Sequence, residues 1–174
     1  MTLVELALVL AVAGILLAIA IPALASMAQA GRLSGFTNEL ISSLHLTRSE
    51  AIKRNSRAVM CKSANGMTCA SSGSWDQGWL VFHDANNNAA LDAGEAVVQA
   101  RQGLPAGFSV TGNRHVASYI SYAPTGATRL RSGGLQVGTL TLCNESETSG
   151  PARQIILSST GRPRIKRIEQ APCP

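Results

Sequence analysis

The feature that most constrains this chain is an uninterrupted apolar run near its N-terminal end. Residues 6–25 read LALVLAVAGILLAIAIPALA and carry no charged side chain. A helix of this length spans roughly 30 Å, the thickness of the hydrocarbon core of a bilayer. No lysine or arginine precedes the run, and it is longer than the apolar stretch of a cleaved secretory signal. We therefore expect a retained, single membrane-spanning helix followed by one further domain.

Glu5 stands at the edge of this run and is the single charge within the first 25 residues. A carboxylate at the edge of the hydrocarbon layer is costly unless it is paired, so Glu5 is a candidate functional residue. The alternative is that Glu5 lies among the lipid head groups.

After Pro22 the pattern becomes amphipathic. Apolar side chains recur at helical spacing between polar ones, at Leu33, Phe36, Leu40, Ile41, Leu44, Ala51 and Ile52. This pattern predicts one long helix over residues 2–54 whose second half packs on the rest of the protein. We divide the chain into a transmembrane segment (1–25), an amphipathic continuation (26–54) and a β-rich head (55–174).

The head reads as short strands separated by turn residues. The predicted strands are 57–62, 78–83, 96–100, 108–111, 118–122, 138–143 and 153–158. Trp75 and Trp79 are expected to close the core beneath the helix. The predicted fold class is α+β, with a long N-terminal helix packed on an antiparallel β-sheet head.

The chain has four cysteines, Cys61, Cys69, Cys143 and Cys173, and no CxxC pair. Without metal-ligand spacing, two disulfides are the simplest interpretation, and four cysteines allow three connectivities. We favour Cys61–Cys69 with Cys143–Cys173. Disulfides imply an oxidising compartment such as a periplasm. The alternative is four reduced cysteines in a cytosolic protein.

The segment Met1-Thr2-Leu3-Val4-Glu5-Leu6, followed by the apolar run with Pro22, resembles the mature N-terminus of type IV pilins and type II secretion pseudopilins. In that family a prepilin peptidase cuts before the first residue of the motif, and the new N-terminus is methylated. The resemblance implies the type IV pilin fold. It also implies that Glu5 pairs with the N-terminal amine of a neighbouring subunit, which would satisfy the buried carboxylate. Pro22 matches the helix-distorting proline, which removes one backbone hydrogen bond. Met1 stands where the family usually has phenylalanine, and the basic leader ending in glycine is missing.

Further patches resemble the GspH/FimT branch of this family: Asn38-Glu39-Leu40, residues 46–54, Val59-Met60-Cys61, residues 75–82 and Asp84. The branch implies other major and minor pilin subunits as partners. It also implies a single-pass inner-membrane protein with a periplasmic head, which later enters a pilus or pseudopilus filament.

Residues 84–95 have oxygen-bearing side chains at the spacing of an EF-hand calcium loop, at Asp84, Asn86, Asn88, Asp92 and Glu95. The sixth position, which should be glycine, is Ala89, and the flanks read as strands. The favoured interpretation is therefore a hairpin turn whose Asn and Asp side chains bond their own backbone. No metal or cofactor is expected.

The C-terminal part is strongly basic. Residues 151–174 hold five basic side chains and one acid, and so contribute most of the chain's net charge of +5. In an extended backbone Arg162, Arg164 and Lys166 share one face, roughly 6.5 Å apart, and can meet successive phosphates. Pro163 confines any strand here to an edge.

Gly161-Arg162-Pro163-Arg164 resembles the GRxR signature near the C-terminus of FimT-type minor pilins. The resemblance implies capture of DNA for natural transformation. From the residues we expect contact through Arg162, Arg164, Lys166 and Arg167, and binding without sequence preference because no recognition helix with base-reading side chains is evident. FimU-type minor pilins, which prime pilus assembly, can carry a similar ending. The alternatives are a basic edge strand that blocks sheet-to-sheet aggregation or a pilin–pilin contact.

Two hypotheses follow. The first is a minor type IV pilin that also binds DNA for uptake in natural transformation. The second is a FimU-like priming pilin, or a GspH-like type II secretion pseudopilin, with no DNA role. We do not expect an enzyme, because the sequence has no nucleophile, phosphate-loop or zinc-protease motif and its histidines, His45, His83 and His115, are scattered.

Overall fold

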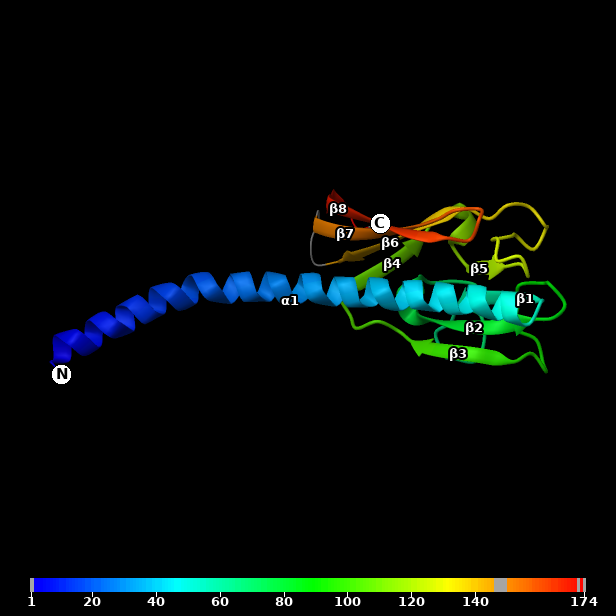
Figure 1. The fold of residues 1–174 in the computed structure, drawn as a ribbon. Coiled ribbons are helices and arrows are strands. Elements are labelled where there is room, and N and C mark those ends of the chain that lie inside the picture. The colour runs from blue at the N-terminus through cyan, green and yellow to red at the C-terminus, as the bar shows by residue number, and fades with distance from the viewer. Residues whose placement is uncertain (1, 146–149, 172, 174) are drawn as a thin grey trace.

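The computed structural model describes residues 2–145, 150–171 and 173. Its first element is α1 (Leu3–Lys53), a continuous helix of 51 residues. Thr2 caps this helix in a capping box: Thr2 Oγ1 accepts from the Glu5 amide at 3.3 Å, and Glu5 Oε2 accepts from the Thr2 amide at 2.7 Å. The first half of α1 projects away from the head in a gentle bow (Figure 1). The long helix predicted from the sequence is confirmed.

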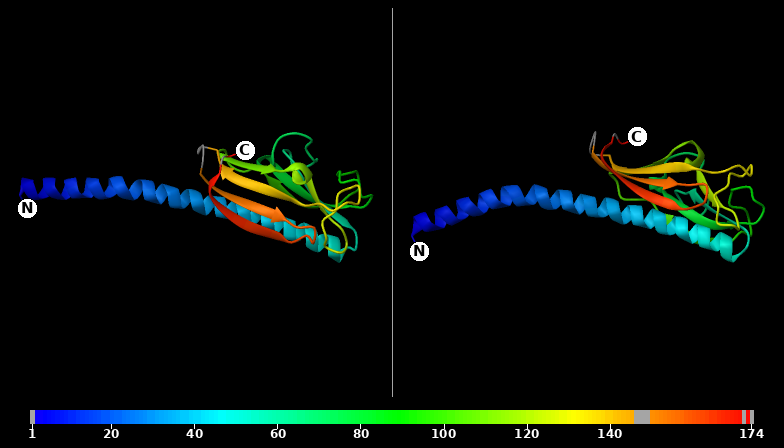
Figure 2. Two further views of the ribbon diagram at one scale, coloured as in Figure 1. Left: turned by 90° about the horizontal axis from the view of Figure 1, so that it is seen from above. Right: turned by 45° about the horizontal axis from the view of Figure 1, so that its top comes forward.

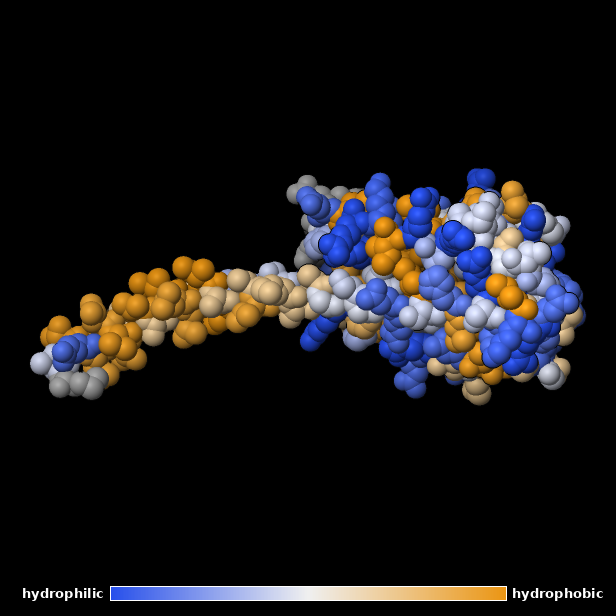
Figure 3. All heavy atoms as spheres, in the orientation of Figure 1, coloured by the Kyte–Doolittle hydropathy of each residue, from blue (hydrophilic) through white to orange (hydrophobic). Residues whose placement is uncertain are grey.

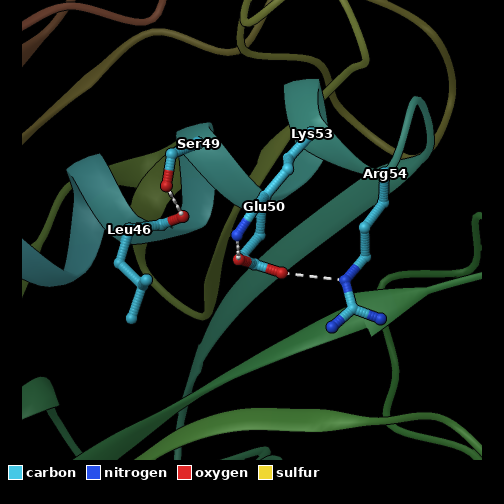
Figure 4. Close-up of polar contacts among 5 residues, drawn as sticks. All are labelled: Leu46, Ser49, Glu50, Lys53 and Arg54. Carbon is cyan, nitrogen blue, oxygen red and sulfur yellow. Dashed lines mark hydrogen bonds and ion pairs between the residues drawn. The ribbon is translucent and has the colours of Figure 1, made fainter.

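The C-terminal end of α1 is held by a small charged cluster (Figure 4). Glu50 accepts from Arg54 Nε at 2.8 Å and lies 3.9 Å from Lys53 Nζ. Ser49 Oγ donates to the Leu46 carbonyl at 2.9 Å. The two cations also suit the negative end of the helix dipole.

In the described part of the head there are eight strands and two one-turn helices. They are β1 (Arg57–Lys62), η1 (Trp75–Gln77), β2 (Gly78–Asp84), β3 (Val97–Gln102), β4 (Phe108–Gly112), η2 (Arg114–Val116), β5 (Tyr119–Tyr122), β6 (Gly138–Asn144), β7 (Gly150–Leu157) and β8 (Pro163–Ala171). The strands form two antiparallel sheets of four, in the orders β3-β2-β1-β5 and β4-β6-β7-β8. Each of the seven predicted strands overlaps one of β1 to β7.

The main core lies between the second half of α1 and the two sheets, as the two further views in Figure 2 help to show. Both tryptophans are fully buried there, as predicted. Trp79 Nε1 donates to Ser43 Oγ at 2.9 Å, and Trp75 Nε1 donates to the Val116 carbonyl at 2.9 Å. Each indole therefore fills apolar space while its N–H group is satisfied.

Burial along α1 begins at Leu33, which is 2% exposed. Over residues 2–32 the side chains are exposed except Ala13, which is half-buried. In Figure 3 this part is an apolar rod that extends from the head, and the surface of the head is mixed and largely polar. Among the described residues α1 is the one helix whose length and apolar composition suffice to cross a membrane. The helix is continuous across the boundary between residues 25 and 26.

Candidate functional site

Glu5 lies at the tip of the exposed half of α1. Its carboxylate accepts from the amide and the hydroxyl of Thr2, at 2.7 and 3.3 Å. The positive end of the helix dipole also favours a negative charge here. Met1 lies outside the described residues, so its role as the cationic partner of Glu5 stays a prediction.

Pro22 lies inside α1, which continues through it from Leu3 to Lys53. A proline has no N–H group and so removes one helical hydrogen bond. The helix curves gently through this exposed half in both views of Figure 2, without a break. Pro22 therefore changes the direction of the apolar rod only slightly.

The basic residues predicted to bind DNA lie on and just before β8, the edge strand of the second sheet. Ile155 and Leu157 of β7 are buried in the core, and they pair with Ile165 and Pro163. Side chains alternate across a strand, so Arg164 and Lys166 lie on the opposite, outer face of the sheet. Both are exposed.

Arg162 precedes β8 and continues its ladder, because its carbonyl accepts from the Ser158 amide at 3.5 Å. It is exposed and lies two residues before Arg164, which places it on the same face in an extended backbone. We call Arg162, Arg164 and Lys166 the outer row. The structure thus brings together three of the four residues predicted to bind DNA.

Arg167 is not part of this row. It pairs in register with Arg153 of β7, on the face that turns toward α1. There it lines a pocket with Arg153 and with Ser34 and Asn38 of α1. Arg167 was predicted to act with the other cations because it is close to them in sequence, but the alternation of side chains along the strand places it on the other face.

The turn before β8 holds Arg162 in a defined position. The Gly161 amide donates to the Ser158 carbonyl at 2.9 Å, and Thr128 Oγ1 donates to the same carbonyl at 2.9 Å. Gly161 has φ +77°, and an added Cβ would lie 2.1 Å from the Gly126 carbonyl oxygen. The glycine of the GRxR motif is therefore required by the backbone conformation and by close packing.

Tyr122, Gly126 and Thr128 support this turn from β5 and the loop after it, and none of them was among the predicted site residues. Tyr122 is fully buried, and its Cε1 would lie 2.9 Å from a Cβ at Gly161. The contact of Gly126 with Gly161 depends on strand pairing across the head, which no local pattern in the sequence indicates.

The outer row has no acidic partner within the described part of the chain. The ion pairs of the head join Glu39 to Arg101, and Glu50 to Lys53 and Arg54. None of these pairs involves β8. The outer row therefore presents positive charge to the solvent that no described residue neutralises.

Two disulfides join the cysteines in the favoured pairing. The Cα atoms of Cys61 and Cys69 are 5.6 Å apart, and those of Cys143 and Cys173 are 5.7 Å apart. The second bridge ties the chain just beyond β8 to β6. Both ends of the basic strand are therefore anchored, by the Gly161 turn and by this disulfide.

The loop predicted as a possible calcium site is a hairpin between β2 and β3. The carboxylate of Asp84 accepts from the amides of Asn88 and Ala89, at 3.1 and 2.9 Å. Asp92 Oδ2 accepts from the side-chain amides of Asn86 and Asn88, at 2.7 and 2.6 Å.

The last candidate ligand of that loop, Glu95, accepts from the Ala85 amide at 2.8 Å. The carboxylates thus serve the loop itself, as in the favoured hairpin interpretation. No group of three or more His, Cys, Asp or Glu side chains among residues 2–145, 150–171 and 173 is placed to hold a metal ion. His45, His83 and His115 lie on three separate elements, α1, β2 and η2.

Comparison with known proteins identifies the family. Residues 37–161, most of the chain, match the family described as type II transport protein GspH. Two crystal structures of the type IV minor pilin FimU of Pseudomonas aeruginosa have similar folds, with TM-scores of 0.56 and 0.58 and 16% identity. The matches cover 77% and 79% of this chain, and 92% and 90% of FimU. No match was found among curated protein sequences. The chain therefore belongs to the GspH family and has the fold of a type IV minor pilin.

Proposed function

We propose that this protein is a minor subunit of a type IV pilus that also binds DNA without sequence preference for uptake in natural transformation. Assembly uses the exposed half of α1, and DNA binding uses the outer row on β8. The observation that carries the proposal is the combination of an unburied apolar half-helix tipped by Glu5 with a basic edge strand that has no described acidic partner.

In the assembly step, the apolar half of α1 first holds the subunit in the inner membrane with the head in the periplasm. A prepilin peptidase produces the N-terminus at Met1, which is then methylated. In the filament the apolar half packs against other subunits, and the Glu5 carboxylate exchanges its bonds to Thr2 for the amine of a neighbour. An ion pair with this amine offsets the cost of holding a carboxylate in an apolar layer.

Glu5→Gln tests the assembly step because glutamine keeps the capping box but not the charge. We expect the variant to enter the membrane normally and to be depleted from sheared filaments, as measured by immunoblot against the parent protein. Glu169→Gln, which removes a carboxylate from β8, serves as the control. Incorporation of the Glu5→Gln protein at the parental level would refute this role of Glu5.

For DNA, three cations on one face of an extended strand can contact successive phosphates. Three contacts with duplex DNA give a log–log salt slope of about −2.7. Between 50 and 200 mM salt such a slope costs roughly fortyfold in affinity. The described residues include no helix with base-reading side chains on the head surface, so we expect no sequence preference.

The test is retardation of a labelled duplex by the full chain in non-ionic detergent across a salt series. We expect Arg162→Ala with Arg164→Ala to weaken binding and to reduce the slope by about 1.8, whereas Arg167→Ala leaves the slope nearly unchanged. Arg32→Ala with Lys53→Ala removes the same charge from α1 and should have little effect. Equal retardation by the parent and the Arg162/Arg164 variant would refute the outer row as the DNA site.

The family match favours a second candidate function, a type II secretion pseudopilin, and the FimU-like fold also allows a pilus-priming minor pilin. Neither role requires DNA. A parent protein that does not retard DNA even at 50 mM salt or below would support this second candidate, because phosphate contacts are strongest at low salt.

A further inference from the structure

A second basic site lies on the face of β8 that is turned toward α1. We propose that Arg153, Arg167 and Asn38 form a pocket that binds a side-chain carboxylate of an adjacent subunit in the filament. This inference rests on the assembly role proposed above. It separates the two faces of β8, with the outer face for DNA and the inner face for a neighbouring protein subunit.

The first argument is the strand register. Arg153 of β7 and Arg167 of β8 are direct partners on adjacent antiparallel strands. The Cβ atoms of such partners are roughly 5 Å apart, and like charges placed there repel one another. Within the described chain no acidic side chain forms an ion pair with either arginine. A carboxylate between the two guanidinium groups would replace this repulsion with two attractive contacts.

The second argument is the set of free donors. Arg153 Nη1 donates to the carbonyl of its neighbour Ala152 at 3.2 Å, and the guanidinium group of Arg167 has no hydrogen-bond partner among the described residues. Asn38, on the adjacent face of α1, is exposed, and its side-chain amide likewise has no partner among the described residues. Two guanidinium groups and an amide therefore converge on one pocket, and they keep N–H donors that no described residue uses. Guanidinium groups bind carboxylates in bidentate geometry.

The third argument is the lining of the pocket. Its other walls are Ser34, Thr37 and Ile165. Ser34 Oγ and Thr37 Oγ1 donate to the helix carbonyls of Ala30 and Leu33, at 2.9 and 2.7 Å. Ile165 is 47% exposed although it lies on the core-facing side of β8. A side chain with an apolar stem and a carboxylate tip fits this combination, since the stem can cover Ile165.

The position of the pocket favours a protein partner over DNA. Ser34 and Asn38 lie within the five residues after Leu33, where α1 first becomes buried in the head. A subunit packed along the exposed half of α1 would therefore reach this pocket at the point where the helix enters the head. A duplex lying on the outer row contacts the opposite face of the sheet and does not reach it.

The experiment compares Arg153→Gln with Arg167→Gln against Arg164→Gln with Lys166→Gln, which removes the same charge from the outer face. Three quantities are measured for the full chain: incorporation into sheared filaments, DNA retardation in detergent, and the melting temperature. We expect the inner variant to lose roughly fivefold in incorporation and to keep DNA retardation within about twofold. The outer variant should show the reverse. The melting temperature of the inner variant should be unchanged or higher, because a repulsive pair has been removed.

Each contrary outcome is decisive. Normal incorporation of the inner variant overturns the pocket, provided that Glu5→Gln is excluded from filaments; normal incorporation of Glu5→Gln instead overturns the assembly role itself. A loss of DNA retardation as large as in the outer variant would assign the pocket to nucleic acid and also overturn the proposal. A lowered melting temperature would contradict the repulsion argument. In that case incorporation into filaments is measured for the single variant Arg167→Gln, whose position is exposed.

Discussion

At the scale of single residues, the backbone conformation of Gly161 holds the start of the basic strand β8 in position. Its φ is +77°, and a Cβ would lie 2.1 Å from the Gly126 carbonyl oxygen. We expect Gly161→Ala to lower the free energy of unfolding by more than about 2 kcal/mol, because strain and a backbone clash add. Denaturant unfolding of the full chain in detergent measures the change.

Gly133→Ala is the matched control for this prediction. Gly133 also has a positive φ, +86°, but a Cβ there would meet nothing within 4 Å. We expect the free energy of unfolding of this variant to fall by about 1 kcal/mol, which is the cost of the backbone conformation alone. Equal losses at the two positions would show that the contact with Gly126 does not matter.

The buried hydroxyl of Tyr122 should make the stability of the protein depend on pH in the alkaline range. Its hydroxyl is buried without a hydrogen-bond partner in the described part of the protein, and burial raises its pKa above the ordinary value of 10.0, an effect that Arg48 partly offsets. The folded state keeps this proton at a pH where the unfolded chain has lost it. Stability should therefore fall as the pH rises above 10.

Tyr122→Phe should remove this part of the pH dependence. The variant should be as stable as the parent near pH 8, or slightly more stable, since an unsatisfied hydroxyl is removed. The measurement is the difference in melting temperature between the two proteins from pH 8 to pH 11. A difference that stays constant across this range would contradict the assignment to Tyr122.

At the scale of elements, β8 is an edge strand that depends on constraints outside its own pairing. The Cys143–Cys173 bridge spans 30 residues of sequence, whereas Cys61–Cys69 spans 8. Loop-closure entropy predicts a loss of roughly 3.6 kcal/mol when the first bridge is removed and roughly 2.5 kcal/mol for the second. Paired Cys→Ser variants and denaturant unfolding test this order.

Hydrogen exchange adds a readout specific to β8. Removing the Cys143–Cys173 bridge should speed exchange of the amides that β7 and β8 share, because the end of an edge strand opens easily. Removing Cys61–Cys69 should leave these amides protected. The same exchange rates in both variants would show that pairing with β7 alone holds the strand.

At the scale of the whole molecule, the apolar half of α1 contributes little to the folding stability of the head. Burial in the head begins at Leu33, and side chains before it that are large and apolar remain exposed, such as Ile19 at 68%. We expect a chain without residues 1–25 to be soluble without detergent. Its melting temperature should lie within a few degrees of that of the full chain, because few core contacts are lost.

Sedimentation and thermal unfolding measure this outcome. An aggregated or unfolded truncation would show that the apolar half contributes to the stability of the head. The control is a chain without residues 1–40, which also lacks Leu33 and the fully buried Leu40 and should unfold more easily.

Much of this architecture could be predicted from local patterns. The apolar run and the amphipathic stripe predicted α1, and alternation between turn residues predicted seven of the eight strands. The basic strand was predicted only as an edge, since Pro163 marked it. The division of strands between two sheets was not predicted, because pairing joins segments far apart in the sequence.

The sequence by itself determined the membrane-length helix, the position of Glu5 and the concentration of positive charge near the C-terminus, because periodicity and composition act locally. Only the tertiary structure decided that Arg164 and Lys166 face outward while Arg167 meets Arg153 beside α1. That choice depends on the register between β7 and β8, and a shift of one residue would exchange the two faces. The physical reason is that a strand carries side chains on both faces, and only its neighbours determine which face lies against the core.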